Sequence, residues 1–209
     1  MKGFFGMFVL SAKEFTKLRT LTVTAMLVAV SMLIEMFAVD VGFIRLNFAF
    51  LATAAIGMLF GPCVGLTAGL ACDVVGHLAH PVGAFLPMYT LAAGLQGLIY
   101  GLFLYHRMDG HSILLVSHST GKQRDLTLFL RMIGARLVDI VVVNLLINTA
   151  LNLHYGFIPE EAYGTAIVAR VAKNVLELAV DIPLLFVVLP AVLMAYKRVF
   201  RLRAKPAEV

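Results

Sequence analysis

Long apolar stretches separated by short polar interruptions constrain this chain more than any other feature. The first clear run covers residues 21–39, and comparable runs follow to near the end of the chain. With 61% hydrophobic and 14% charged residues over 209 positions, a soluble domain could not bury so much apolar side chain. The sequence therefore predicts a single-domain integral membrane protein, and it excludes a disordered chain, a disulfide-knit secreted module and most soluble enzymes.

The lengths of the apolar runs predict six membrane-spanning helices, since about 20 helical residues cross a bilayer. They cover residues 21–39, 47–60, 62–78, 87–105, 126–153 and 164–196. Gly61 ends the second helix, and Pro62 suits the first turn of the third. The predicted fold class is therefore all-α, a polytopic membrane protein with six transmembrane helices.

The distribution of Lys and Arg predicts the orientation of these helices. One side of the membrane collects Lys2, Lys13, Lys17, Arg19, Arg107, Lys122, Arg124, Arg131, Lys197, Arg198, Arg201, Arg203 and Lys205. Cytoplasmic segments are enriched in such residues, so both termini are predicted to be cytoplasmic. Residues 1–20 are expected to form an amphipathic lead-in on the membrane surface rather than a cleaved signal peptide, and residues 197–209 a basic tail. The net charge of +5 is then an orientation signal and not a sign of nucleic-acid binding.

Polar side chains inside the last span point to a ligand, because charge within a membrane is costly and usually faces a cavity or a partner. One stripe of this helix carries Arg170, Lys173, Asn174, Glu177 and Asp181. Mutual pairing of Arg170, Lys173 and Glu177 is the structural alternative. Five polar groups exceed what such pairing needs, so a stripe facing a ligand is preferred.

Three further spans carry polar or aromatic side chains at helical spacing. The fifth has Asn144, Asn148 and Asn152, which would either join helices or read the edge of a polar heterocycle. The third ends in Asp73, His77 and His80, where a hydrogen-bond acceptor for a ligand amine is preferred over a metal site. The fourth aligns Tyr89, Gln96 and Tyr100; Phe85, Tyr89 and Thr90 lie near the outer mouth, whereas Tyr100 is expected to pack.

Small residues and missing motifs limit the other possibilities. Gly57, Gly61, Gly65 and Gly69, and then Gly94, Gly97 and Gly101, are expected to let helices pack closely. Cys63 and Cys72 are too far apart along one helix to form a disulfide. The chain has no phosphate-binding loop and no supported nucleophilic or metalloprotease motif, so neither an ATPase nor an enzyme is predicted.

Several segments resemble the substrate-binding S components of energy-coupling factor (ECF) vitamin transporters, most closely the folate-specific family. They are residues 43–48 (FIRLNF), 57–62 (GMLFGP), 71–76 (ACDVVG), 81–87 (PVGAFLP), 98–103 (LIYGLF) and 170–174 (RVAKN). The resemblance extends over about residues 18–196. It implies a membrane subunit in the bacterial cell membrane that binds a vitamin from outside, with residues 40–46 and 79–86 as gating loops.

The same resemblance implies partners and a binding site. Ala25 and Ala29 are similar to the docking face for a transmembrane coupling subunit, which works with two ATPases that consume ATP. No covalently bound cofactor and no metal are implied; the ligand would be a folate or related pterin. The candidate ligand-binding residues are Arg45, Asn47, Asp73, Phe85, Tyr89, Thr90, Asn144, Asn148, Asn152, Arg170, Lys173, Asn174 and Glu177.

The carboxylates of a folate suit the predicted outer cations Arg45, Arg170 and Lys173, and its pterin amine suits Asp73 or Glu177. Other ligands remain open within the class, namely a queuosine precursor, riboflavin, thiamine or a metal. A self-contained carrier using Glu177 and Asp181 as proton relays, and a membrane enzyme using Asp73 with the two histidines, are the alternatives from other classes.

Overall fold

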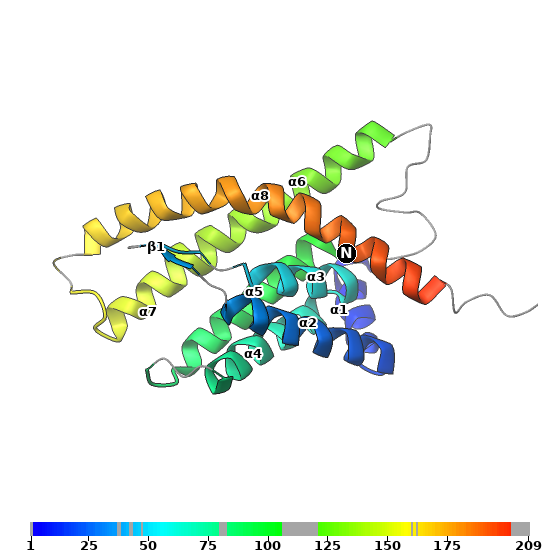
Figure 1. The fold of residues 1–209 in the computed structure, drawn as a ribbon, viewed down its shortest axis with the longest axis horizontal. Coiled ribbons are helices and arrows are strands. Elements are labelled where there is room, and N and C mark those ends of the chain that lie inside the picture. Colours follow the sequence, from blue (N-terminus) through cyan, green and yellow to red (C-terminus); the bar gives the residue numbers. More distant parts are fainter. Residues whose placement is uncertain are drawn as a thin grey trace, which may run out of the picture.

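The computed structural model describes residues 2–36, 39–41, 44–46, 48–79, 83–105, 121–159, 161 and 163–201, with only the backbone described for 2–4, 39–41, 44–46, 121–128 and 201. In chain order the elements are α1 (Lys2–Glu14), α2 (Leu18–Met36), β1 (Val39–Val41), β2 (Ile44–Leu46), α3 (Phe50–Phe60), α4 (Pro62–Ala79), α5 (Pro87–Leu104), α6 (Gly121–Asp139), the π-helix η1 (Ile140–Ile147), α7 (Asn148–His154) and α8 (Tyr163–Arg201). Within these residues the fold is all-α, as predicted, apart from one short hairpin (Figure 1).

Among the described residues, four helices are long and apolar enough to cross a membrane. They are α2, α4, α5 and the part of α8 that runs to Phe200. α3 is apolar but has 11 residues, and the fifth predicted span is divided among α6, η1 and α7. The boundaries predicted for the third and fourth spans agree with α4 and α5 to within one residue. The multi-pass membrane character is thus evident, whereas the number of spans stays a prediction.

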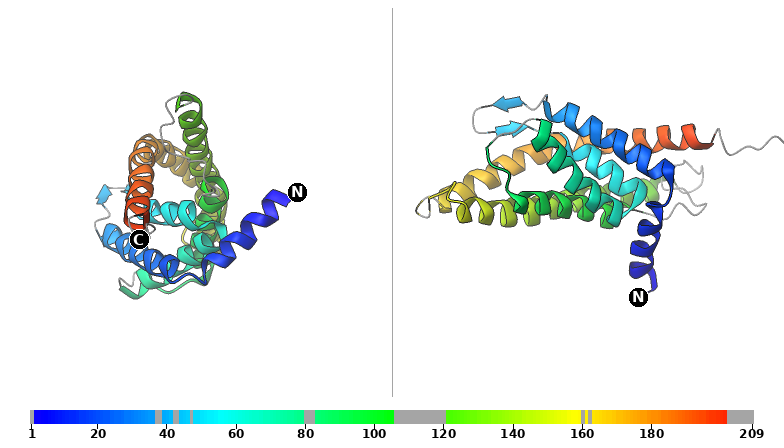
Figure 2. Two further views of the ribbon diagram at one scale, coloured as in Figure 1. Left: turned by 90° about the vertical axis from the view of Figure 1, so that its right-hand side faces the viewer. Right: turned by 90° about the horizontal axis from the view of Figure 1, so that it is seen from below.

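The predicted N-terminal lead-in consists of a helix and a turn. α1 ends at Glu14 and α2 begins at Leu18, earlier than the predicted start at residue 21. The turn is held by Glu14, whose carboxylate accepts from Lys17 Nζ at 2.6 Å and from Thr20 Oγ1 at 3.0 Å. α1 projects away from the long axis of the bundle (Figure 2).

The segment predicted as the first loop contains two strands. β1 and β2 pair in antiparallel fashion, with Asp40 opposite Arg45 in the register. The pairing satisfies backbone groups that an irregular loop would leave to other partners. Residues 42–43, and residues 80–82 of the second predicted gating loop, lie outside the described part of the chain.

α3 forms the centre of the core because it is apolar on every side. All of its residues are buried, and α2, α4, α5 and α8 contact it. A helix without a polar face is stable only when it is surrounded. α3 is therefore the central helix of the bundle, with α2, α4, α5 and α8 packed around it (Figure 1).

Glycines bring α4 and α5 into backbone contact, which confirms the packing role predicted for them. A Cβ atom added to Gly97 would lie 2.0 Å from the carbonyl oxygen of Gly65, and one added to Gly69 would lie 2.2 Å from that of Ala93. α3 joins this seam, since a Cβ on Gly57 would lie 2.7 Å from the amide nitrogen of Gly101. We call these contacts the glycine seam; it allows no side chain between the helices.

The break between α3 and α4 is closed by a residue from α1. Gly61 has a φ of +90°, which glycine adopts without strain, and Pro62 opens α4. The buried hydroxyl of Ser11 donates to the Phe60 carbonyl at 2.8 Å and accepts from the amides of Cys63 at 3.0 Å and Val64 at 3.3 Å. Ser11 thereby satisfies backbone groups that the helix ends leave unpaired.

Candidate functional site

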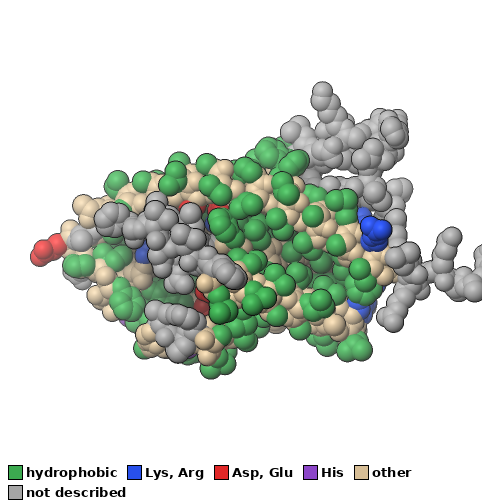
Figure 3. Space-filling model, in the orientation of Figure 1, with side chains coloured by type: hydrophobic (Ala, Val, Ile, Leu, Met, Phe, Trp, Pro, Cys, Tyr) green, Lys and Arg blue, Asp and Glu red, His purple; other side chains and the backbone are tan. Residues whose placement is uncertain are grey.

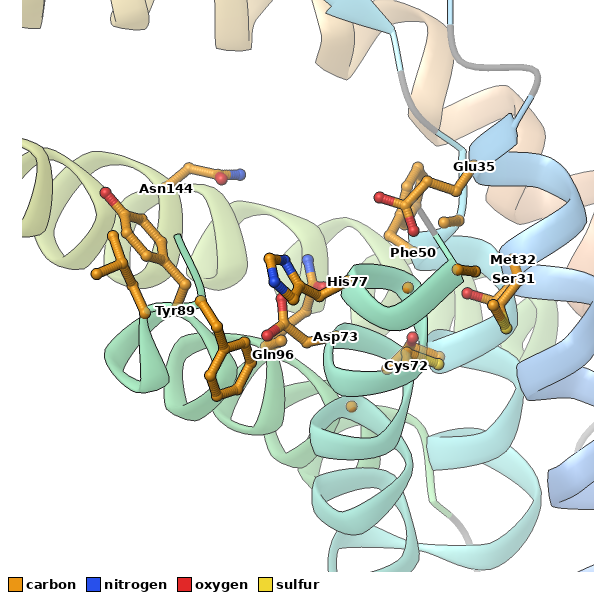
Figure 4. A pocket seen from close by; sticks show the side chains of 18 of the residues that line it. Ser31, Met32, Glu35, Phe50, Cys72, Asp73, His77, Tyr89, Gln96 and Asn144 are labelled. Atoms are coloured by element: carbon orange, nitrogen blue, oxygen red, sulfur yellow. The ribbon is translucent and has the colours of Figure 1, made fainter. Parts of the chain in front are cut away.

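An open cavity of about 1290 Å³ lies among α2, α4, α5, η1 and α8 (Figure 4). The predicted site residues that line it are Asp73, Phe85, Tyr89, Asn144, Lys173 and Glu177. The structure adds lining residues that were not among the candidates, including Glu35, Phe50, Cys72, His77, Gln96, Arg136, Tyr155 and Phe157. The cavity therefore combines charged, amide and aromatic side chains inside an otherwise apolar bundle.

The outside of the bundle differs sharply from this interior. On the face shown in Figure 3, hydrophobic side chains cover the middle of the molecule, and Lys and Arg side chains gather at one end. Large apolar side chains such as Met26, Leu33 and Val187 are exposed on α2 and α8. Such a surface suits a lipid environment, so the polar cavity is the place where a water-soluble ligand can be held.

The wall formed by α2 and α4 is acidic. Glu35 and Asp73 both line the cavity, and Thr90 from α5 donates to Asp73 Oδ2 at 2.6 Å. Thr90 is itself buried, so it orients Asp73. The ring of His77 lies 5.2 Å from that of Phe85, between centroids. This wall can accept hydrogen bonds from a ligand and offers a ring surface beside them.

Lys173 is the basic residue of the opposite wall, on α8, and Arg170 of the same helix is not among the described lining residues. Lys173 Nζ lies 3.3 Å from Glu177 Oε1, and both residues line the cavity. Arg170 Nη1 donates to the backbone oxygen of Asn144 at 3.4 Å. Asn174 is buried rather than lining the cavity. The predicted stripe is thus divided: part of it faces the cavity, and the pairing foreseen as an alternative occurs between Lys173 and Glu177.

The asparagines of the fifth predicted span take different positions. Asn144 lies in η1 and lines the cavity, and its side-chain oxygen accepts from Asn148 Nδ2 at 3.4 Å. Asn152 in α7 accepts a short hydrogen bond from the Tyr89 hydroxyl. Both roles considered for these amides therefore have a basis: Asn152 joins α7 to α5, whereas Asn144 is accessible to a ligand.

Aromatic residues gather where α5 approaches the end of α7. The rings of Tyr89 and Tyr155 are stacked with centroids 6.1 Å apart, and Phe157 lies 6.3 Å beyond Tyr155. Sequence reasoning selected Tyr89 but missed Tyr155 and Phe157, which follow the fifth predicted helix immediately. Their position just after the end of a predicted helix was the signal that could have identified them as candidates for the cavity lining. The cluster provides flat apolar surface along the cavity.

Beneath the cavity lies a buried charged network that sequence reasoning missed. Arg136 donates to Asp181 Oδ2 from Nε at 3.0 Å and from Nη2 at 2.6 Å, and to Asp139 Oδ2 from Nη1 at 2.7 Å. Its guanidinium carbon lies 4.0 Å from the centre of the Phe50 ring. Tyr100, which is buried as expected, donates to Asp139 Oδ2 at 3.1 Å. We call these residues, with Gln96, the Arg136 network; it connects α5, α6 and α8.

The remaining predicted residues are not among the described residues that line the cavity. The backbone of Arg45 lies in β2, but its side chain and the whole of Asn47 are outside the described residues, as is His80. Ala25 and Ala29 are exposed on α2. Both cysteines are free, as their spacing predicts. Within the described part of the chain, no three His, Cys, Asp or Glu residues are grouped to hold a metal ion.

Comparisons with known proteins agree on one kind of protein. A family model described as "ECF-type riboflavin transporter, S component" matches residues 15–189. The folate transporter FolT of Clostridium novyi (strain NT) is 41% identical over 64 residues, and that of Streptococcus mutans serotype c is 36% identical over 58 residues. These matches cover 31% and 28% of this chain, and they span only 37% and 31% of the relatives' lengths.

A solved structure is similar over most of the chain. The crystal structure of FolT bound with folic acid has a TM-score of 0.62 and 26% sequence identity. The match covers 82% of this chain and 91% of the other. The two chains thus share a fold over most of their lengths.

Proposed function

Because the chain belongs to the family of S components of ECF-type transporters, we propose that it binds a folate-type ligand for import. Family membership makes it a multi-pass membrane transport protein and not an enzyme. The observation that carries the choice of ligand is the cavity with an acidic wall, a basic wall and aromatic surface between them. The folate relatives and the folic-acid-bound neighbour support the same choice.

The chemistry of a folate matches these walls at both ends. Its aminopyrimidinone ring carries adjacent N–H donors, which suit Asp73 and Glu35 on the acidic wall. The carboxylates of its glutamate tail suit Lys173, with Arg170 nearby. The flat ring system between them can stack on the cluster around Tyr89. A folate therefore lies across the cavity, with its ring toward α4 and its tail toward α8.

Calorimetry on the purified, detergent-solubilised protein tests this proposal directly. Folic acid and 5-formyltetrahydrofolate are expected to bind tightly, whereas riboflavin, the ligand in the description of the matching family, is expected not to bind. Mass spectrometry of small molecules released on denaturation should recover a folate. Binding of riboflavin without binding of either folate would overturn the proposed ligand and leave the family unaffected.

We also propose that α2 is the docking face for the transmembrane coupling subunit, whose two associated ATPases supply the energy. Ala25 and Ala29 support this, because they are exposed one turn apart and leave a shallow surface for another helix. Both termini are proposed to be cytoplasmic, supported by the clustering of Lys and Arg at one end of the bundle. The predicted six spans would include α3 and the α6–η1–α7 segment.

Uptake measured in cells separates docking from ligand binding. Ala25→Leu with Ala29→Leu should abolish folate uptake while leaving calorimetric binding unchanged. The matched control is Val187→Leu with Ala191→Leu, which adds side-chain volume to an exposed part of α8. Retained uptake by the α2 variant, or equal loss in the control, would contradict the docking role.

A further inference from the structure

The carboxamide of Gln96 is held in a single orientation by the network beneath it. Gln96 Nε2 donates to Asp139 Oδ2 at 2.9 Å, and a carboxylate accepts hydrogen bonds but cannot donate them. Turning the amide over would place its carbonyl oxygen against the carboxylate. The side chain therefore directs its nitrogen toward Asp139 and keeps its oxygen, Oε1, for another donor.

Asp139 cannot move to accommodate the opposite orientation. It is fully buried, and its Oδ2 also accepts from Arg136 and Tyr100. Arg136 in turn is fixed by two hydrogen bonds to Asp181 from α8. Side chains from three helices thus hold the carboxylate that orients Gln96.

Gln96 lines the cavity together with Asp73, which lies on the neighbouring helix (Figure 4). Thr90 occupies Asp73 Oδ2, so Asp73 Oδ1 is the oxygen that remains for a ligand. The glycine seam brings the two helices into backbone contact nearby, since Gly97 adjoins Gln96 and Gly69 lies four residues before Asp73. This side of the cavity therefore presents acceptors from both α4 and α5.

We propose that Gln96 is a specificity-determining residue whose Oε1 accepts a hydrogen bond from the exocyclic amine of the ligand's aminopyrimidinone ring. An exocyclic amine has two N–H groups, and Asp73 Oδ1 and Gln96 Oε1 supply the two acceptors. A ligand with an acceptor or a methyl group in that position leaves the oxygens unpaired and is rejected. This inference rests on the proposed binding of a folate. It adds that the protein recognises the ring by its exocyclic amine.

The test compares folic acid with its 2-desamino-2-methyl analogue, in which a methyl group replaces the exocyclic amine. The wild-type protein should prefer folic acid strongly in calorimetry. Gln96→Met, which has a similar shape but no acceptor oxygen, should reduce this preference about tenfold. Thr67→Val is the matched control, because it removes an exposed hydroxyl that bonds only within α4, to the Cys63 and Val64 carbonyls, and it should leave the preference unchanged.

Asp139→Asn provides a second measurement that addresses orientation. An amide at position 139 can accept from Gln96 Nε2 or donate to Gln96 Oε1, so Gln96 can turn its nitrogen to the cavity and the preference should fall. Equal weakening of both compounds in Gln96→Met, or an unchanged preference, would overturn this inference while the proposed function stands. Failure of the wild-type protein to bind either compound would overturn both.

Discussion

The two sides of the cavity are assembled by different kinds of contact. On one side, α3, α4 and α5 touch through the backbone at the glycine seam, where no side chain intervenes. On the other, α6 and η1 are connected to α8 by side-chain hydrogen bonds, through Asp181 and Arg170. The comparison teaches that packing on the first side tolerates no added side-chain volume, whereas stability on the second side depends on keeping buried charges paired. Substitutions should therefore affect the two sides through different physical terms.

The largest effect is expected from added volume in the glycine seam. Gly97→Ala places a Cβ 2.0 Å from the Gly65 carbonyl oxygen, which can be relieved only by separating α4 from α5. Overpacking ordinarily costs about 1–3 kcal/mol. Here the added atom meets backbone that cannot rotate away, so the cost exceeds this range and α4 and α5 are expected not to pack together. We expect loss of the monodisperse protein peak in detergent size-exclusion chromatography.

Gly164→Ala is the matched control for the seam. Nothing lies within 4 Å of a Cβ at that position in α8, so the variant should keep its yield or gain slightly from higher helix propensity. A Gly97→Ala protein with the yield and unfolding temperature of wild type would show that the glycine seam can accommodate an added side chain.

Removing the buried cation should produce the next largest effect, and it probes the charged side. Arg136→Met leaves Asp139 and Asp181 buried without their partner, which costs about 3–5 kcal/mol. The triple variant Arg136→Met, Asp139→Asn, Asp181→Asn removes the charges together and should recover much of this loss. Thermal unfolding followed by circular dichroism measures the stability of both variants. Equal unfolding temperatures would show that unpaired buried charge is not what destabilises the single variant.

A smaller effect on binding is expected from the basic wall. Lys173→Met should weaken the binding of folic acid about 10- to 100-fold, the range for a lost hydrogen bond to a charged group. Pteroic acid, which lacks the glutamate, should lose much less affinity. The pair of ligands serves as an internal control, because similar losses for both would mean that Lys173 does not hold the glutamate tail.

The smallest effect is expected at the edge of the seam, where Ser11 joins α1 to the α3–α4 break. Ser11→Ala removes the hydroxyl that bonds Phe60 and Cys63, at a cost of about 0.5–2 kcal/mol for a helix cap. Thr22→Ala is the control, since its exposed hydroxyl bonds only within its own helix at Leu18. A destabilisation no larger than that of Thr22→Ala would show that the Ser11 hydrogen bonds do not stabilise the contact of α1 with the bundle.

Local patterns in the sequence were enough to predict much of the fold. Apolar runs located α4 and α5 almost to the residue, and Gly61 with Pro62 located the break before α4. The glycine spacing predicted the close packing that the seam displays. These features depend on neighbouring residues along one helix, so a single sequence contains the information.

Features that depend on distant partners could not be predicted in the same way. Arg136 lies well inside the fifth predicted span, where an arginine should have signalled a buried partner, but Asp181 is 45 residues further along the chain. The asparagine spacing predicted one shared face, whereas the π-helix η1 begins just after Asp139 and changes the direction of the side chains that follow. Asp181 was seen as part of a ligand-facing stripe, and its contact with Arg136 places it in the core instead.

The hydroxyl of Ser11 also imposes an order of events during synthesis. Its partners at Phe60, Cys63 and Val64 are 49 to 53 residues further along the chain. At a translation rate of about 5–20 residues per second, they leave the ribosome roughly 2–10 seconds after Ser11. The hydrogen bonds of Ser11 can therefore form only after α2 and α3 have been made and α4 has begun, so the first helix to emerge has to wait for three later helices before it reaches its final contacts.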